Sequence, residues 1–479
     1  MADTCTLHIL HTNDLHSHFG SMPSIASCLR LHREQWEALG EHVLTVDIGD
    51  HADRMDVKTE ATWGQVNVDV LNHSGYQYVT IGNNEGITFP KEKLDALYEK
   101  ASFTVVLGNL FELATGEVPH WAVSHAIHQW EDLCVGILGA TASFPLFYKM
   151  LGWEARDPLE QLRQQVAALR PHVDVIILMS HLGYPEDCRL ARELDGVDII
   201  LGAHTHHQLE HGERIGKTLI AQTGVLGKKV GHVRLVWDRQ AKQVMEASAE
   251  LFASEAYLPE RELAEYLAKK QLLTEEMLEQ TAVQLAVDLD VSWMEETVFG
   301  SVLAASLRKW TKAEVGMANN GLLLAPLSKG KVSYRDLLRC LPHPIKPCAV
   351  SLSGEQLWRV LAQSIQPETV RRELRGFGFR GKVTGWMGID GLQVWYEEGE
   401  QPRITRIEVN GELLDKERSY RVGTVDMFML NRLFPDLAEG EHVRFYLPEM
   451  LREILAQTLG DAELLAAAQK PRWLMMASS

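Results

Sequence analysis

Acidic, amide and imidazole side chains recur directly after five short apolar runs of the chain. The groups are His11-Thr12-Asn13-Asp14-Leu15-His16, Asp47-Ile48-Gly49-Asp50, Gly82-Asn83-Asn84-Glu85, Met179-Ser180-His181-Leu182-Gly183 and Leu201-Gly202-Ala203-His204-Thr205-His206. Any one such group is more often a cap or a turn than a ligand set. Five in order, each after a predicted strand, indicate convergence on one edge of a sheet. Carboxylate and imidazole ligands together suit Mn, Zn, Fe or Co.

These groups need a scaffold whose strands end side by side. Runs rich in Val, Ile and Leu predict buried strands at 7–11, 43–47, 78–81, 104–107, 135–139, 173–179, 197–201 and 218–222. Amphipathic segments such as 158–169 lie between several of them. Alternation of this kind predicts a layered α/β fold, and open α/β sheets place their chemistry at strand ends.

The length of 479 residues favours two large domains. The sequence changes character near Asp238, and the run from Pro259 to Ala286 predicts either a long connecting helix or an amphipathic helix packed on one domain. Beyond it, helices are expected at 299–310, 354–364 and 450–457, and strands at 391–396, 403–409 and 419–424. This α+β pattern leads us to expect a domain at 1–240, a linker at 241–290 and a second domain at 291–479.

The charge balance excludes some classes of partner. A net charge of −18 and a pI near 5.6 argue against binding to nucleic acid polymers or anionic membranes. A phosphate substrate would then need local positive charge, which metal ions supply. The start MADTCTLHIL resembles no secretory signal, no run is long enough to span a membrane, and the six cysteines form no CxxC pair. We therefore expect a cytoplasmic protein with reduced thiols.

The five groups resemble the signature of calcineurin-like metallophosphoesterases, which reads D-x-H, G-D, G-N-H-[DE], a later H and G-H-x-H. The 5′-nucleotidase branch, in particular its leaderless cytosolic bacterial members, is similar also at 220–232 and in the second domain. There the matching positions are Glu296-Thr297, Gly300, Asn319-Asn320-Gly321 and Tyr420–Thr424. The resemblance covers nearly the whole chain.

This resemblance implies a four-layer α/β/β/α sandwich followed by an α+β substrate-binding domain, with the active site between them. It also implies two divalent ions (Mn, Zn, Fe, Co or Mg). Asp14, His16, Asp50 and His206 would hold one, and Asp50, Asn83, His181 and His204 the other. Asp50 can bridge because a carboxylate has two oxygens. A bridging hydroxide would then attack the phosphorus of a nucleotide, as in a 5′-nucleotidase of nucleotide catabolism.

The chain departs from this pattern near the third group. Asn84 stands where the family has a His that stabilises the transition state, and Ile87 stands where a supporting Asp is common. A neutral amide donates a weaker hydrogen bond than a cation does. We expect Asn84 itself, or His18, His51 or Arg54 near other strand ends, to serve the reaction. An ordinary surface role explains the last three equally well.

The second domain departs as well. Leu324 occupies the position of the Arg in the family motif N-x-G-G-x-R, which leaves Asn319 in place. We expect an arginine of the basic loop 371–388 to contact the substrate instead, foremost Arg375, with Arg371, Arg372 and Arg380 as alternatives. Nucleobase stacking is expected between Phe379 and Phe434, with Phe377 and Phe428 as neighbours. Such phenylalanines are more often core residues.

Other functions therefore stay open. With the same ions, the chain could hydrolyse cyclic nucleotides, nucleotide sugars or another small phosphoester. A non-catalytic, metal-containing nucleotide-binding protein is the alternative from a different class. The complete set of ligands favours an enzyme, because buried carboxylates and imidazoles need partners. The oligomeric state is not indicated by the sequence.

Overall fold

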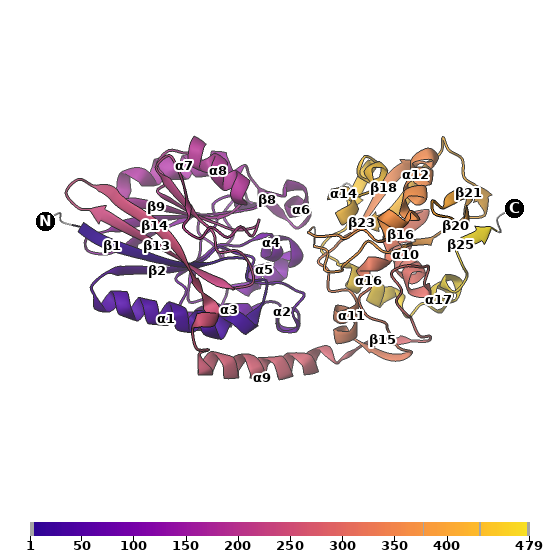
Figure 1. The fold of residues 1–479 in the computed structure, drawn as a ribbon, viewed down its shortest axis with the longest axis horizontal. Helices are drawn as coiled ribbons and strands as arrows, with labels where there is room; N and C mark the ends of the chain where they lie inside the picture. Colours follow the sequence, from indigo (N-terminus) through magenta and orange to yellow (C-terminus); the bar gives the residue numbers. More distant parts are fainter. Residues whose placement is uncertain (1–3, 377, 431–432, 477–479) are drawn as a thin grey trace. The chain divides into compact units, whose positions relative to one another are not determined.

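The computed structural model describes residues 4–376, 378–430 and 433–476 (Figure 1). The chain divides into two compact units, Met1–Thr274 and Glu275–Ser479. Each unit has its own hydrophobic core.

Two six-stranded sheets form the centre of the first unit. One has the order β14-β13-β1-β2-β3-β4, with β14 at Gln243–Ala253, β13 at Lys229–Asp238, β1 at Thr4–Thr12, β2 at His42–Asp47, β3 at Tyr78–Val79 and β4 at Thr104–Val105. The other has the order β11-β12-β10-β9-β7-β6, with β11 at Glu213–Ile215, β12 at Thr218–Ala221, β10 at Ile199–Gly202, β9 at Val175–His181, β7 at Cys134–Thr141 and β6 at His125–Gln129. In each sheet the strands that precede the ligand groups run parallel to one another, so their carboxyl ends share one edge.

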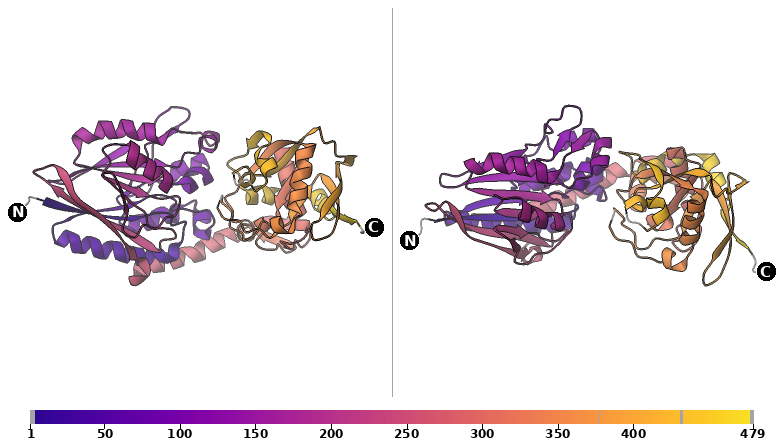
Figure 2. Two further views of the ribbon diagram at one scale, coloured as in Figure 1. Left: turned by 45° about the horizontal axis from the view of Figure 1, so that its top comes forward. Right: turned by 90° about the horizontal axis from the view of Figure 1, so that it is seen from above.

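Helices cover the outer face of each sheet. Helices α1 (Met22–Ala38) and α3 (Gln65–Ser74) flank the first sheet, and α7 (Pro158–Leu169) and α8 (Tyr184–Glu193) flank the second (Figure 1). The turned view keeps this order of layers (Figure 2, left). Between the sheets lies a core to which both contribute, including Leu7, Val46 and Ile177. The predicted four-layer α/β/β/α fold is therefore confirmed.

The strands lie where the apolar runs predict them, but β3 and β4 are only two residues long. The hairpin of β13 and β14 adds two strands that the sequence did not reveal. The first unit therefore extends beyond residue 240, the boundary expected from the sequence. Strand β14 lies at the edge of its sheet, and most of its side chains are exposed or half-buried, so it has no apolar run of the kind that marks the buried strands.

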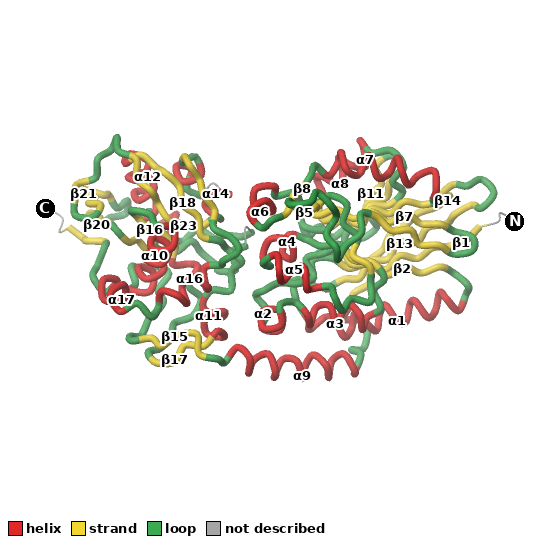
Figure 3. Tube along the Cα trace, turned by 180° about the vertical axis from the view of Figure 1, so that it is seen from behind, coloured by secondary structure: helices red, strands yellow, loops and turns green. Residues whose placement is uncertain are grey.

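The long helix is shorter than predicted. Helix α9 spans Arg261–Leu278, and the chain then forms β15 at Thr281–Leu285, which pairs with β17 at Gly330–Ser333 (Figure 3). The prediction of helix up to Ala286 is wrong at this end. Thr281 and Val283 are β-branched and suit a strand, but the partner strand lies about fifty residues away, so the periodicity of the run does not show it.

The second unit is an α+β domain, as predicted. It contains a five-stranded sheet, β19-β16-β23-β18-β24, and a four-stranded sheet, β22-β21-β20-β25. The strands are β16 (Val315–Asn319), β18 (Pro347–Ser353), β19 (Met387–Asp390), β20 (Leu392–Glu397), β21 (Arg403–Val409), β22 (Glu412–Leu413), β23 (Ser419–Val425), β24 (Glu441–Phe445) and β25 (Trp473–Met476). Helices α10 (Val298–Thr311), α12 (Gly354–Ser364) and α16 (Leu451–Thr458) match the predicted ones. Among the described residues, no helix combines the length and the apolar character needed to cross a membrane.

Candidate metal centre

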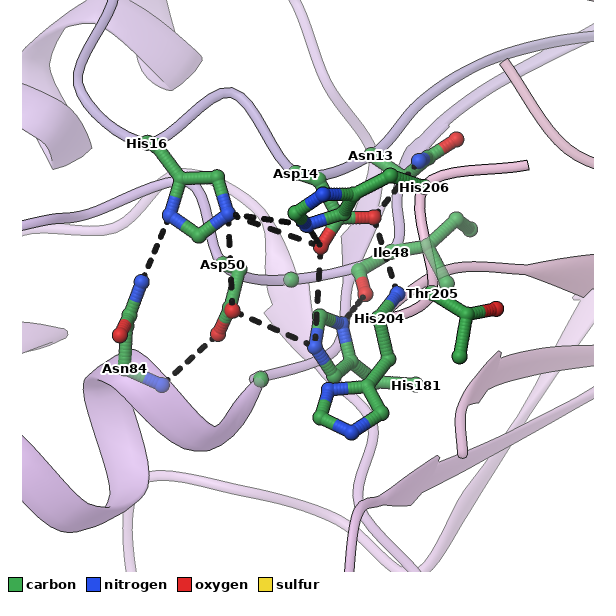
Figure 4. Close-up of polar contacts among 12 residues, drawn as sticks. Asn13, Asp14, His16, Ile48, Asp50, Asn84, His181, His204, Thr205 and His206 are labelled. Carbon is green, nitrogen blue, oxygen red and sulfur yellow. Dashed lines mark hydrogen bonds and ion pairs between the residues drawn. The ribbon is translucent and has the colours of Figure 1, made fainter. Parts of the chain in front are cut away.

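The carboxyl ends of five strands bring the predicted ligands together in the first unit. Three are the ends of β1, β2 and β3 of the first sheet, and two are the ends of β9 and β10 of the second. Figure 4 shows imidazole rings from both sheets facing the carboxylates of Asp14 and Asp50. The four-layer fold therefore places ligands from both sheets around one point.

Asp14, His16 and His206 form the first part of this cluster. Asp14 Oδ1 lies 3.4 Å from His206 Nε2 and 3.9 Å from His16 Nε2. The two imidazole nitrogens are 3.3 Å apart. Because all three atoms point inward, one cation could contact all of them.

Asp50 and His181 form the second part, again together with Asp14. Asp50 Oδ2 lies 3.5 Å from His181 Nε2 and 3.9 Å from His16 Nε2. The ring of His181 is fixed because Nδ1 lies 2.7 Å from the carbonyl oxygen of Ile48, to which it donates. Because Nδ1 is the donor in this bond, Nε2, the atom that faces the carboxylates, is the nitrogen that would bind a cation.

Asn83 and His204 complete the predicted set. Asn83 is the first residue of α4 (Asn83–Thr88), and its Oδ1 is buried. The backbone N–H of His204 donates to Asp14 Oδ2 at 2.9 Å, and its ring centroid lies 5.3 Å from that of His181. His181 thus ends β9 and Asn83 begins α4, and the other five predicted ligands come from the loops at this centre.

The fit of this centre to metal ions can be judged from its polar atoms. Asp14 Oδ1, Asn83 Oδ1 and His181 Nε2 are buried, and none has a hydrogen-bond partner within the described part of the chain. Buried polar atoms are nearly always paired in native structures. A cation would satisfy all three at once, and the mixture of oxygen and imidazole donors suits a borderline divalent metal.

The backbone of the ligand loops is strained in a way that favours the same conclusion. Left-handed φ angles occur at Asp14 (49°), His16 (47°), Asp50 (50°), His204 (71°) and His206 (58°). Such conformations cost on the order of 1–3 kcal/mol each for residues other than glycine, and they cluster at functional sites. A fold that keeps five of them together must overcome this cost by its remaining contacts.

The electrostatics of the centre favour a bound cation. Burial alone would lower the pKa of His181, but the charge of Asp50, with smaller contributions that include Asp14, outweighs burial and raises that pKa to about 10. Burial and the charge of His181 lower the pKa of His204 to about 4, which leaves that ring neutral. A cluster that holds a proton so tightly would also attract a divalent ion.

Two residues that sequence reasoning overlooked support the ligand loops. Glu85 is buried and accepts hydrogen bonds from the backbone N–H groups of Asp50 (3.0 Å), Ala52 (2.7 Å) and Gly82 (2.9 Å), so it joins two loops. Asn13 donates to Asp14 Oδ2 at 2.8 Å. The sequence held a signal for each: Glu85 stands at the [DE] position of the motif G-N-H-[DE], and Asn13 directly precedes the predicted ligand Asp14.

The residues expected to serve the reaction lie in different environments. Asn84 is 5% exposed, and its side chain lies against His16, with 2.7 Å between Asn84 Nδ2 and His16 Nδ1. His18 is exposed, and its Nδ1 lies 2.9 Å from Ser21 Oγ. Burial lowers the pKa of the enclosed His51 to about 3, so this ring is neutral.

Arg54 has a structural environment. Its guanidinium is buried, donates to both carboxylate oxygens of Glu60 at 2.8 and 3.0 Å and to the carbonyl oxygen of Thr88 at 2.8 Å, and lies over the ring of Trp63. A bidentate pair of this kind holds a guanidinium firmly. The predicted phosphoryl contact of Arg54 gains no support from this arrangement.

The predicted substrate residues belong to the second unit and are dispersed between its surface and its core. Arg375 is 90% exposed and lies 3.5 Å from Glu373. Asn319 is buried at the end of β16 and donates to the carbonyl oxygen of Thr384 at 2.6 Å. Phe379 stacks on His343 at a centroid distance of 5.5 Å.

Phe434 is fully buried and contacts Phe428 edge to face at 5.1 Å. Phe377, named as a neighbour, lies outside the described residues. Phe379 and Phe434 both belong to the hydrophobic core of this unit, so their stacking role stays a prediction.

Known proteins share both units. Residues 7–208 match the family model of the calcineurin-like phosphoesterases, and residues 278–432 match that of the 5′-nucleotidase C-terminal domain. The uncharacterized metallophosphoesterase YunD of Bacillus subtilis is 37% identical over 459 residues, which cover 95% of this chain and 99% of that protein.

Solved structures share the fold over the full length. A 5′-nucleotidase precursor from Thermus thermophilus matches with a TM-score of 0.58 at 20% identity, covering 99% of this chain and 100% of that one. The NAD nucleotidase of Haemophilus influenzae matches with a TM-score of 0.67 at 16% identity, covering 99% and 98%. With both units matched in order, the chain belongs to the 5′-nucleotidase family of calcineurin-like metallophosphoesterases.

Proposed function

We propose that this phosphoester hydrolase is a dinuclear-metal enzyme that removes phosphate from nucleotides. The observation that carries the proposal is the group of buried ligand atoms without partners around Asp14 and Asp50. The family to which the chain belongs supports hydrolysis of a phosphoester, and the second unit supports a nucleotide as the substrate.

The ligands would divide between two ions. The first would be held by Asp14, His16, Asp50 and His206, and the second by Asp50, Asn83, His181 and His204. The position of Asp50 supports this division, because its Oδ2 lies within 3.9 Å of both His16 and His181. Mn, Zn, Fe, Co and Mg are the candidate ions, and such ions neutralise phosphoryl oxygens and lower the pKa of water.

The chain itself would orient these ligands. The Ile48 carbonyl holds the His181 tautomer, and Asn13 with the backbone of His204 holds the Asp14 carboxylate. Among the residues expected to contact the phosphoryl group, His18 has the exposure that such a contact requires. If it makes this contact, His18→Ala should lose activity while both ions stay bound.

A second candidate function keeps the ions and changes the substrate. Asn84 stands where the family has a His that stabilises the transition state, and Leu324 stands where it has an Arg that helps to hold the substrate. Both replacements leave room for a cyclic nucleotide, a nucleotide sugar or another phosphoester as the substrate. One of the solved relatives is an NAD nucleotidase by name, and this name supports including a dinucleotide in any test.

The deciding experiment is phosphate or nucleotide release from a substrate panel. The panel contains nucleoside monophosphates, cyclic nucleotides, nucleotide sugars, NAD and an aryl phosphate, each tested with chelated protein that is resupplied with Mn, Co, Zn or Mg. Metal-dependent release that is lost in Asp50→Asn would support the enzyme, and the best substrate would identify the activity. If the wild-type protein binds two ions and hydrolyses none of these substrates, the chain is instead a non-catalytic, metal-containing nucleotide-binding protein.

A further inference from the structure

The two nitrogens of His16 face different surroundings. On one side, Nε2 faces Asp14, Asp50 and His206 at 3.3–3.9 Å. On the other side, Nδ1 lies 2.7 Å from the amide of Asn84 and 3.5 Å from Asp53 Oδ2 (Figure 4 shows the Asn84 contact). The ring therefore stands between a candidate ion and two polar side chains.

A ligating histidine needs a partner for its second nitrogen. When Nε2 binds a metal, the ring proton resides on Nδ1, and this N–H is almost always donated to a carboxylate, a carbonyl or water. Asp53 Oδ2 can accept it directly. The Asn84 amide can accept it through its oxygen after a half-turn of the amide plane, because the two ends of an amide have the same shape.

Both partners are themselves held in place. Asp53 Oδ1 accepts the backbone N–H of Met55 at 2.9 Å, and its own N–H donates to Ser17 Oγ at 2.8 Å. Asn84 lies in the first turn of α4, and its carbonyl oxygen accepts the Thr88 hydroxyl at 2.6 Å. Asn84 and Asp53 are 5% and 2% exposed, so neither side chain can swing away easily.

Asn84 also reaches a second ligand. Its backbone N–H donates to Asp50 Oδ1 at 2.7 Å, while its side chain lies against His16. One residue thus connects the carboxylate and the imidazole that face each other across the candidate site. The Nδ2 end of the amide is therefore taken up by His16.

Resting on the metal-dependent function proposed above, we propose that Asn84 and Asp53 are positioning residues that hold His16 with Nε2 toward the ion. In this chain the residue at position 84 orients a metal ligand instead of contacting the substrate. Asp53 adds a carboxylate whose negative charge strengthens the imidazole as a donor. Position 84, which holds a His in the family motif, would therefore support a metal ligand in this chain.

Cobalt binding tests this proposal without reference to activity. Chelated wild-type protein is titrated with Co²⁺, and the visible absorption band and the number of bound ions are recorded. Loss of such an outer partner costs about 10- to 100-fold in metal affinity. We expect Asn84→Ala and Asp53→Ala each to weaken one of the bound ions by this factor and to change the band, and the double variant to weaken it further.

Conservative variants should restore binding. Asn84→Asp keeps an acceptor for the Nδ1 proton, and Asp53→Asn keeps an oxygen but loses the charge, so both should bind Co²⁺ more tightly than the alanine variants. Asn72→Ala is the matched control. It removes an amide with three hydrogen bonds in the same unit, to Lys100 and Ser102, and should leave Co²⁺ binding unchanged.

Unchanged Co²⁺ affinity and an unchanged band in both alanine variants would overturn the proposal, whatever their activity. Loss of phosphate release in Asn84→Ala with unchanged Co²⁺ binding would also overturn it, because Asn84 would then contact the substrate. If Asn84→Ala does not fold, the near-isosteric Asn84→Leu replaces it. Failure of the wild type to hydrolyse any substrate would refute the proposed function alone, since the Co²⁺ titration would still report on His16.

Discussion

The ligand loops of the first unit and the basic segment 371–388 of the second unit contrast in how their polar groups are held. At the ligand site, Asp14, Asp50 and His181 are buried, and Asp50 Oδ2 lies 3.5 Å from His181 Nε2 and Asp14 Oδ1 3.4 Å from His206 Nε2. In the basic segment, Arg375 is 90% exposed and has an exposed glutamate beside it. A buried charged side chain can be replaced by few other residues, because it needs a partner at the correct distance and angle.

This difference explains why the motifs of the two units carry different information. A short spacing such as Asp14-x-His16 must be kept when both side chains share one buried centre. An exposed arginine can be supplied by several neighbouring positions, and a buried phenylalanine can serve the core alone. The first region therefore reveals its chemistry in its motifs, and the second reveals mainly its fold.

The largest effect is expected at Asp14. Asp14→Asn removes the charge of an oxygen that faces both His206 and His181. Metal ions contribute several kcal/mol of transition-state stabilisation, so we expect a loss of about a thousandfold or more in metal-dependent phosphate release. Asp95→Asn, which changes a half-buried carboxylate paired with Lys91, is the control. Equal activity of Asp14→Asn and Asp95→Asn would show that Asp14 matters no more for hydrolysis than a carboxylate outside the ligand loops.

The next largest effect, on the free energy of unfolding, is expected at Phe434, a residue of the hydrophobic core of the second unit. Phe434→Ala should lower the free energy of unfolding of the second unit by about 3–5 kcal/mol, as is typical for a buried phenylalanine. Phe299→Ala changes another fully buried ring of that core and should cost as much. Denaturant unfolding measures both variants. A KM for nucleotide that rises only in Phe434→Ala would instead assign this ring to the substrate.

A buried acid of the first unit should make its stability depend on pH. Burial, only partly offset by the Ser180 hydroxyl that donates to Asp187, raises the pKa of Asp187 to about 8. The folded state therefore keeps a proton that the unfolded state releases near pH 4. This stabilisation is complete below pH 4 and is lost as the pH rises through 8.

Asp187→Asn should remove this slope. The thermal midpoints of the chelated wild type and of the variant are compared between pH 5 and 8. The control is Asp461→Asn, which changes a half-buried helix cap of the second unit. A wild-type midpoint that falls no more steeply than that of Asp187→Asn would show that Asp187 is ionised in the folded state.

The smallest effect is expected at Arg375. Because the side chain is exposed, Arg375→Ala should change stability by no more than about 0.5 kcal/mol. If it contacts the substrate from the surface, KM should rise by up to about fivefold, equivalent to about 1 kcal/mol, with kcat unchanged. Arg261→Ala removes an arginine that is 88% exposed in the first unit and serves as the control. Equal KM values in both variants would exclude Arg375 from substrate binding.

Much of the fold could be predicted because its signals are local. Buried parallel strands are apolar runs, and the positions of β1, β2, β9 and β10 follow from them. Strand β13 and the end of α9 were not predicted, because β13 pairs with β1 near the start of the chain and β15 pairs with β17 about fifty residues further on. The same limit applies to Arg54, because one of its partners, the carbonyl oxygen of Thr88, lies 34 residues further along the chain.

By itself, the sequence determined the family, the layered architecture and the ordered set of potential ligands, because residue types and their spacing are sufficient for these. Only the tertiary structure decided what each side chain faces. It placed Asp53 and Asn84 behind His16, Glu85 between two loops and Phe434 inside a core. These contacts join residues from different strands and helices, and their geometry exists only after the layers have packed.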